Sequence, residues 1–280
     1  MRKIILITGF IITIVASGFG QTILDGAYVK ENIRTKKVVP YPALREADVL
    51  WSKEVWRIID LREKINFPLY YPIEPIKDRL SLFDVIRQAI LVDGSLTAYN
   101  PGPTKQDDEF NFPYSQTELR QIFTQVDTVT AEDPDTGEFV EVVQETELSS
   151  AEITQYRLKE YWVFDKQTST MQVRIIGIAP MKELYSEEGM FLGHQPIFWI
   201  YYPEARYVFV NYEVFNPSND AQRLSFDDVF TKRIFNSYID KEANAYDRKI
   251  MEYAQGLDAL LEAERIKEEI FTWEHDLWSY

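Results

Sequence analysis

Side chains that commonly catalyse reactions or hold metal ions are scarce in this sequence of 280 residues. The chain has no cysteine, which excludes disulfides, thiolate metal sites and a cysteine nucleophile. Its two histidines, His194 and His275, lie too far apart for a metal-binding motif, and neither lies in the context of a serine-type triad. A glycine-rich phosphate loop and a zinc-protease motif are both missing. The sequence therefore predicts no catalytic residue, metal, cofactor or small-molecule substrate.

Carboxylates are the one abundant reactive group. The chain carries 45 Asp and Glu against 30 Lys and Arg, a net charge of −15, which disfavours a nucleic-acid partner because such binding depends on clustered cations. A glycosidase-type pair needs only two acids at a suitable separation, so a secreted carbohydrate-active enzyme is an alternative. The acidic run at 133–137 lacks the later ligands of an EF-hand. Its proline and glycine predict a hairpin turn instead.

The first twenty residues have the layout of a secretory signal peptide. Arg2 and Lys3 precede a largely apolar run at 4–15, and small residues lead to Gly20 and Gln21. As a helix, this run covers about 18 Å, well short of the ~30 Å core of a bilayer. We expect cleavage near Gly20–Gln21 and a soluble protein outside the cytoplasm. The alternative is an uncleaved membrane anchor.

Apolar periodicity and turn residues predict several helices after an extended arm. Residues 21–43 show no helical period and predict the arm. Residues 44–65 predict a helix, because Trp51, Val55, Ile58 and Ile59 share one stripe. A connector or short strand is expected at 67–75, and a helical or linker segment at 152–159. Further helices are predicted at 81–92, 116–123, 225–238 and 242–278, the last broken near Gly256.

Aromatic and β-branched residues predict antiparallel strands in the second half of the chain. The strands are expected at 161–164, 171–178, 197–202 and 206–215, with a separate hairpin at 126–143. The predicted fold class is α+β: an antiparallel β-sheet region packed with several helices and a long C-terminal helix. The expected parts are a signal peptide (1–20), the extended N-terminal arm (21–43), a first α+β part (44–150), an antiparallel β-sheet part with a helix (151–240) and a C-terminal helical segment (241–280).

A short internal echo links two of the predicted helix starts. Residues 79–85 read Arg-Leu-Ser-Leu-Phe-Asp-Val, and residues 223–229 read Arg-Leu-Ser-Phe-Asp-Asp-Val. Each follows a Tyr-Tyr-Pro sequence and spaces a serine and an aspartate as in a capping box. The echo predicts two related α+β halves, with chance similarity as the alternative.

Residues 36–66 carry a resemblance to a known family. They read Lys-Lys-Val-Val-Pro-Tyr-Pro-Ala-Leu-Arg-Glu-Ala-Asp-Val-Leu-Trp-Ser-Lys-Glu-Val-Trp-Arg and continue Ile-Ile-Asp-Leu-Arg-Glu-Lys-Ile-Asn. With residues 79–86 and the strand region 162–215, this sequence resembles the gliding motility protein GldN (PorN) family. The resemblance covers essentially all of the chain after the signal peptide.

The resemblance implies a periplasmic structural subunit of the type IX protein secretion and gliding motility machinery. Members of the family associate with the lipoprotein GldK (PorK) in a ring complex under the outer membrane, and that ring couples to the motor proteins GldL and GldM (PorM). No enzyme activity is implied, and no catalytic residue carries over. Besides the carbohydrate-active enzyme, the residues leave one more alternative: a peptidoglycan-binding module whose aromatic side chains stack on sugars.

An interaction protein needs exposed contact residues, and three segments supply candidates. They are the arm, the polar face around Trp56 and the C-terminal helix. The chain has 17 Tyr, 17 Phe and 6 Trp, and such large, rigid side chains suit interfaces, although most must fill the core. A neighbouring segment that covers Trp56 is the alternative there, and the C-terminal helix could pack in cis or in trans. The candidate partner-binding residues are Arg34, Val38, Tyr41, Arg45, Trp56, Tyr253 and Leu257.

Overall fold

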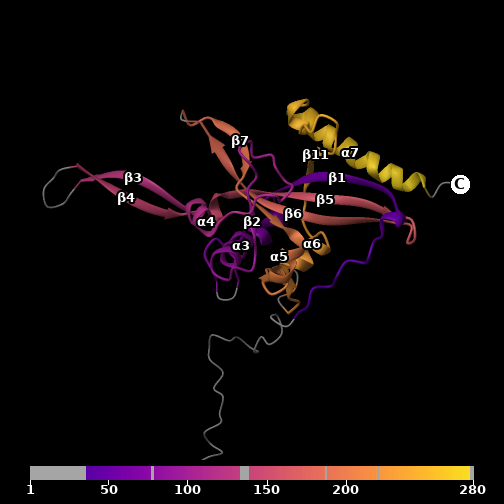
Figure 1. Cartoon of the computed structure of the whole chain (residues 1–280), viewed down its shortest axis with the longest axis horizontal. Coiled ribbons are helices and arrows are strands. Elements are labelled where there is room, and N and C mark those ends of the chain that lie inside the picture. Colours follow the sequence, from indigo (N-terminus) through magenta and orange to yellow (C-terminus); the bar gives the residue numbers. More distant parts are fainter. Residues whose placement is uncertain are drawn as a thin grey trace, which may run out of the picture. The chain divides into compact units, whose positions relative to one another are not determined.

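The computed structural model describes residues 36–76, 79–132, 139–186, 188–217, 219 and 221–277 (Figure 1). The predicted signal peptide and the candidate Arg34 lie outside these residues. Residues 34–280 form one unit, which is organised by an antiparallel sheet of seven strands. The predicted α+β class, with a long C-terminal helix, is confirmed.

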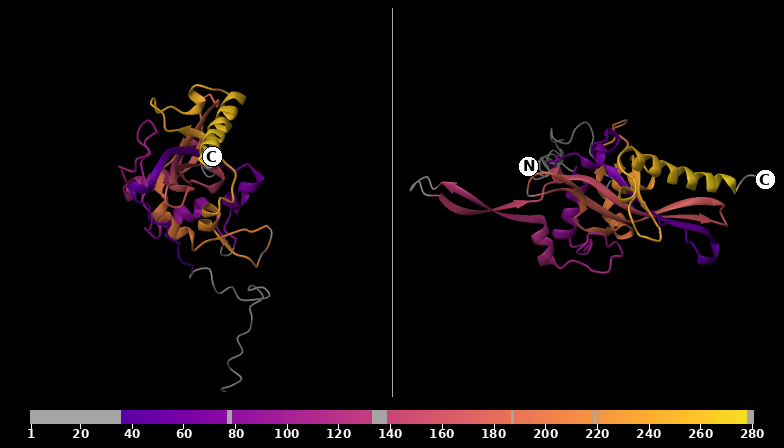
Figure 2. Two further views of the ribbon diagram at one scale, coloured as in Figure 1. Left: turned by 90° about the vertical axis from the view of Figure 1, so that its right-hand side faces the viewer. Right: turned by 90° about the horizontal axis from the view of Figure 1, so that it is seen from above.

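The main sheet has the strand order β11-β1-β5-β6-β8-β2, and β7 pairs with β6 outside this order. The long strands β1, β5 and β6 lie side by side at its centre (Figures 1 and 2). Every pairing in the sheet is antiparallel. The bounds are β1 (Val49–Asp60), β2 (Ala98–Tyr99), β5 (Ile153–Asp165), β6 (Thr170–Tyr185), β7 (Phe191–Pro196), β8 (Trp199–Tyr201) and β11 (Tyr238–Glu242).

The predicted first helix, at 44–65, is wrong: these residues form β1. This strand pairs with β5 on one side and with β11 on the other, and residues 55–59 are all buried. A strand that is covered on both faces loses the alternation of apolar and polar residues. Its apolar spacing then fits a helix as well as a strand. The β-branched Val55, Ile58 and Ile59 were the signal that favoured a strand.

The hydrophobic core contains a large cluster, a smaller one and a third of only three buried residues, Trp56, Ala179 and Trp199. The larger cluster joins α3, α5 and α6 to the strands, with Phe83, Phe209 and Phe230 nearly inaccessible. The smaller cluster holds α7 against β1 and β11. Figures 1 and 2 show α3, α5 and α6 grouped away from α7. The bounds are α2 (Phe67–Tyr70), α3 (Leu82–Leu91), α4 (Gln116–Phe123), α5 (Tyr202–Phe209), α6 (Phe226–Thr231) and α7 (Leu257–Asp276).

Several sequence-based predictions are confirmed and others need correction. The helices at 81–92 and 116–123 and the hairpin of β5 with β6 are confirmed. So is the separate hairpin, made by β3 (Thr124–Glu132) and β4 (Phe139–Glu147), which extends away from the main sheet (Figures 1 and 2). Its acidic turn at 133–138 lies outside the described residues.

The remaining predictions are wrong for one reason: burial in the folded protein differs from what each local sequence pattern indicates. The segment at 152–159 belongs to β5, and the short connector at 67–75 begins with α2. The predicted helices at 225–238 and 242–278 are shorter, because residues 238–242 form β11 at the sheet edge and α7 begins after Gly256. The predicted strand at 206–215 overlaps α5, where Tyr202, Ala205 and Phe209 are buried at helical spacing and Pro203 occupies the first turn.

The echo corresponds to two equivalent helix starts. The Ser81 hydroxyl accepts a hydrogen bond from the Asp84 amide at 3.1 Å, and the Ser225 hydroxyl accepts one from the Asp228 amide at 3.2 Å. They cap α3 and α6, as the spacing predicts. Strands β9 (Glu213–Val214) and β10 (Leu224–Ser225) precede α6, and a single antiparallel bridge precedes α3. Duplication of two halves stays a prediction.

Gly177 gives a direct test of core packing, because its neighbours leave no room for a side chain. A Cβ atom there would lie 2.5 Å from Cζ of Phe110 and 3.2 Å from Cε3 of Trp199. We expect Gly177→Ala to lower the free energy of unfolding by about 1–3 kcal/mol, measured by urea denaturation. The cost should shrink in a Phe110→Ala background, because the clashing ring is then absent. Equal costs in the two backgrounds would contradict this packing.

Candidate interaction surfaces

The described part of the arm, residues 36–43, is attached to its own chain through Tyr41. The Tyr41 ring centroid lies 4.6 Å from the guanidinium carbon of Arg206 and 5.5 Å from that of Arg174. Both arginines also donate to arm carbonyls: Arg206 Nη2 to Val39 O at 2.8 Å, and Arg174 Nη2 to Pro42 O at 2.6 Å. Burial raises the pKa of the Tyr41 phenol above its ordinary value. The arm is therefore bound by cation–π contacts and charge-assisted hydrogen bonds.

Carboxylates of α6 hold the arginine side of this contact in place. Asp227 accepts two hydrogen bonds from Arg206, at 2.7 and 3.3 Å, and both side chains are buried. The neighbouring Asp228 accepts from Lys36 of the arm and from Ser225. Burial raises the pKa of Asp228, but the hydrogen bonds from Lys36 and Ser225 outweigh this effect and lower the pKa to about 2. The carboxylate thus stays charged opposite Lys36 over the physiological range of pH.

Two other candidates, Val38 in the arm and Arg45 just after it, are less strongly held. Val38 is half-buried, and Arg45 is exposed and pairs with Asp48, three residues on, with Nε 2.7 Å from Oδ2. Tyr41 is thus the anchor of the described arm, whereas Arg45 remains accessible.

Trp56 is buried, so the expectation of an exposed contact face around it is wrong. Only 3 % of its surface is accessible. Its indole Nε1 donates to Asp108 Oδ2 at 2.6 Å, and Lys159 Nζ donates to Asp108 Oδ1 at 2.7 Å. Lys241 Nζ lies 4.3 Å from the centroid of the indole ring. The polar residues around Trp56 therefore form a satisfied internal network, and the covering segment that was the alternative comes from the loop that carries Asp108.

Helix α7 packs on its own chain along one stripe and leaves the opposite side open. Ala263, Ile266 and Ile270 are buried in the smaller core cluster, and Trp273 stacks on Trp51 with ring centroids 4.8 Å apart. This stripe of the C-terminal helix therefore packs in cis.

A C-terminal patch, defined as Tyr253, Leu257, Leu260 and Leu261, is exposed around the start of α7. These side chains are 42, 70, 56 and 59 % exposed. Residues three and four apart share one side of a helix, so the three leucines form one surface on the first turns of α7. Tyr253 lies near the same end of α7, because its hydroxyl lies 3.4 Å from Glu262 Oε1. The candidates Tyr253 and Leu257 are thus both exposed near the start of α7.

A further exposed apolar surface was not predicted from the sequence. We call it the hairpin tip: Leu184, Tyr185, Met190, Phe191 and Leu192, which are 40, 54, 63, 53 and 60 % exposed. It lies where β6 and β7 extend from the main sheet as a two-stranded hairpin (Figure 1). The detectable signal was an apolar run, Met190-Phe191-Leu192, directly after a glycine turn, where polar residues are usual.

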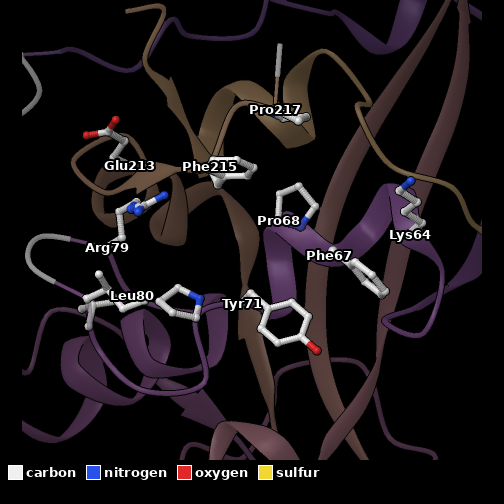
Figure 3. Close-up of a pocket in the computed structure, with 11 residues that line it drawn as sticks. Lys64, Phe67, Pro68, Tyr71, Arg79, Leu80, Glu213, Phe215 and Pro217 are labelled. Carbon is white, nitrogen blue, oxygen red and sulfur yellow. The ribbon is translucent and has the colours of Figure 1, made fainter. Parts of the chain in front are cut away.

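A pocket of about 390 Å³ lies between α2 and the segment at 213–217 (Figure 3). Three aromatic rings line it, those of Phe67, Tyr71 and Phe215, which are 38, 48 and 47 % exposed. Its other lining residues are Lys64, Pro68, Pro72, Ile76, Arg79, Leu80, Glu213 and Pro217. None of these residues was predicted from the sequence to bind a partner.

Within the described part of the chain, groups suited to catalysis are not brought together in this pocket. Glu213 is the one acidic residue among its described lining residues, so these residues do not supply the carboxylate pair that a glycosidase needs. Burial lowers the pKa of His194, whose Nε2 lies 3.9 Å from Glu183 Oε1, on the hairpin of β6 and β7. Among the described residues, no three His, Asp or Glu side chains are placed to hold a metal ion. In the same ranges, none of the helices has the length and apolar character to cross a bilayer.

Comparison with known proteins gives one result that covers most of the chain. A family model described as gliding motility associated protein GldN matches residues 44–279. No curated protein matches the sequence. The matched range includes every strand of the main sheet, the hairpin tip, the pocket and the C-terminal patch.

Proposed function

The chain belongs to the family of gliding motility associated protein GldN, and on that premise we propose that it is a periplasmic structural subunit of the type IX protein secretion and gliding motility machinery. In this proposal it forms a ring complex with the lipoprotein GldK (PorK), which ties it to the outer membrane, and couples to the GldL/GldM motor through the periplasmic part of GldM (PorM). It makes and breaks no covalent bonds. The match over residues 44–279 is the observation that carries the proposal.

The distribution of apolar surface supports a role in assembly. The hairpin tip and the C-terminal patch come from different elements, and each exposes several large apolar side chains. Contiguous apolar surface that is exposed on a protein usually marks a site of interaction. A subunit inside a closed ring must use two different surfaces, one for each neighbour, in addition to any surface for other partners.

The arm is the weaker candidate for a partner contact. Tyr41 and Lys36 are already engaged by Arg174, Arg206 and Asp228 of the same chain. A partner that used these residues would have to replace these contacts. The C-terminal patch needs no such rearrangement, so we assign the contact with GldK to it.

Affinity purification after crosslinking in the periplasm tests the proposal. We expect the tagged protein to recover GldK in stoichiometric yield. Replacing Leu257, Leu260 and Leu261 by serine should lower this recovery about tenfold or more, because well-packed apolar residues at an interface contribute most of its binding energy. Stability should change little, since these side chains are exposed.

Glu268→Ser provides the matched control, because Glu268 is an exposed polar residue of the same helix and its loss should leave recovery unchanged. Wild-type protein that recovers no lipoprotein would argue against a subunit of this complex. Equal recovery with the serine variant would reject the C-terminal patch as the contact and direct attention to the hairpin tip.

A further inference from the structure

We propose that the pocket between α2 and the segment at 213–217 binds an extended segment of another protein that contains proline and an adjacent acidic residue. Proline-rich segments adopt the polyproline II conformation before they bind, so they lose little conformational entropy on docking. They are typically recognised by grooves lined with aromatic side chains. The proposal goes beyond the assembly role and does not depend on the ring.

The lining of the pocket has the composition that such segments require. Phe67, Tyr71 and Phe215 present half-exposed rings, and Figure 3 shows the rings of Pro68, Tyr71 and Phe215 around one hollow. Proline rings pack on flat aromatic faces without needing hydrogen bonds. The volume of about 390 Å³ accommodates a few side chains of an extended peptide rather than a folded element.

The walls of the pocket are fixed by the core beneath them. The Asn66 side chain, which is fully buried, donates to Asp60 O at 2.7 Å and to Asn236 O at 3.0 Å. Leu69 of α2 is buried in the large core cluster. These contacts hold α2, and with it the Phe67 and Tyr71 rings, which meet edge to face at 5.5 Å. A preorganised site of this kind spends little binding energy on ordering itself.

Charge distinguishes an acidic ligand from a neutral or basic one. Lys64 and Arg79 both line the pocket, and no ion pair within the described residues involves either of them. Arg79 lies over the Phe215 ring at 5.5 Å. Among the described lining residues, one carboxylate, Glu213, stands against these two cations, so these residues carry a net positive charge on a chain whose overall charge is −15. A carboxylate on the bound segment would complement that local charge.

A glycan fits the same surface less well. A sugar ring presents several hydroxyl groups, each of which needs a hydrogen-bonding partner when it leaves water. The pocket is mostly aromatic, aliphatic and proline side chains, with three charged groups among its eleven lining residues. The lining thus favours a peptide.

Fluorescence anisotropy of the purified protein with labelled peptides tests the proposal. The probe is Glu-Pro-Pro-Leu-Pro-Pro. One companion carries lysine in place of the glutamate, and a second carries glycine at every proline. We expect saturable micromolar binding of the probe, binding about tenfold weaker for the glycine peptide, and clearly weaker binding for the lysine peptide.

Variants of the chain locate the site of binding. Phe215→Ala should weaken probe binding about tenfold, and Arg79→Ala should remove the preference for glutamate over lysine. Tyr207→Ala is the matched control, because Tyr207 is an aromatic residue, 69 % exposed, outside the pocket. Circular dichroism verifies that each variant is folded.

Three results would overturn the proposal. One is the failure of the wild-type protein to bind the probe saturably. Another is equal binding by the wild-type protein and Phe215→Ala. A third is saturable binding of soluble peptidoglycan fragments, lost in Phe215→Ala, by a protein that does not bind the probe. None of these results bears on recovery of the lipoprotein, so the two proposals fail independently.

Discussion

Trp56→Ala is expected to lower the free energy of unfolding by about 3–5 kcal/mol, measured by urea denaturation. The indole is only 3 % exposed and packs with Ala179 and Trp199. Its removal leaves a cavity and deprives the buried Asp108 of the hydrogen bond from Nε1 at 2.6 Å. Both losses act in the folded state, so the midpoint of unfolding should fall strongly.

Two further variants separate packing from hydrogen bonding at this site. Trp56→Phe keeps most of the ring but loses the donor, so it should cost about 1–3 kcal/mol. Tyr207→Ala removes an aromatic side chain that is 69 % exposed and should change stability by about 0.5 kcal/mol or less. A Trp56→Ala protein that keeps its stability but fails to recover its partner would restore Trp56 as a contact residue.

Arg206→Met is expected to destabilise the protein by about 3–5 kcal/mol and to release the arm. Arg206 is 4 % exposed and pairs with Asp227, which is 7 % exposed. The substitution leaves a carboxylate buried without its cation, and methionine supplies no donor for Val39 O and no cation over the Tyr41 ring. Thermal unfolding measures the loss of stability. Faster tryptic cleavage at Lys36 and Lys37 measures release of the arm.

Two control variants accompany Arg206→Met: one keeps the charge at this position, and the other removes an exposed arginine elsewhere. Arg206→Lys keeps the charge but not the two parallel hydrogen bonds to Asp227, so it should fall between the wild type and the methionine variant. Arg265→Met removes an exposed arginine that pairs with Glu262 and Glu269 on α7, and should cost about 1 kcal/mol or less. If Arg206→Met loses no more stability than Arg265→Met, Arg206 and Asp227 do not form a buried ion pair in solution.

Both predictions test whether side chains that resemble contact residues belong to the internal structure of the protein. Trp56 and Tyr41 are large aromatic residues with polar neighbours, as interface residues often are, but the structure engages both within the chain. The hairpin tip, the C-terminal patch and the pocket instead expose their aromatic and aliphatic side chains. We therefore propose the hairpin tip and the C-terminal patch as assembly contacts and the pocket as the site of peptide binding.

Much of the architecture follows from local sequence signals. Ser81 and Ser225 begin helices because a hydroxyl three residues before an acidic side chain satisfies backbone groups within a single turn. The hairpin of β5 and β6 follows from its aromatic and β-branched residues around a polar turn. These signals involve only neighbours in sequence, so they can be recognised without knowledge of the fold. Membership of the family was likewise visible from the run at 36–66.

What the sequence determined by itself was the class of the fold, its Ser-capped helices, its hairpins and its family. Only the tertiary structure decided which side chains face solvent. The same apolar spacing in 49–60 fits a helix or a strand covered on both faces, and partners from β5 and β11, about a hundred and nearly two hundred residues away, selected the strand. In the same way, Trp56 is buried where it donates to Asp108. Packing in the smaller core cluster determines which stripe of α7 is buried, and Leu257 stays exposed. Burial is set by contacts between distant segments, which no local pattern encodes.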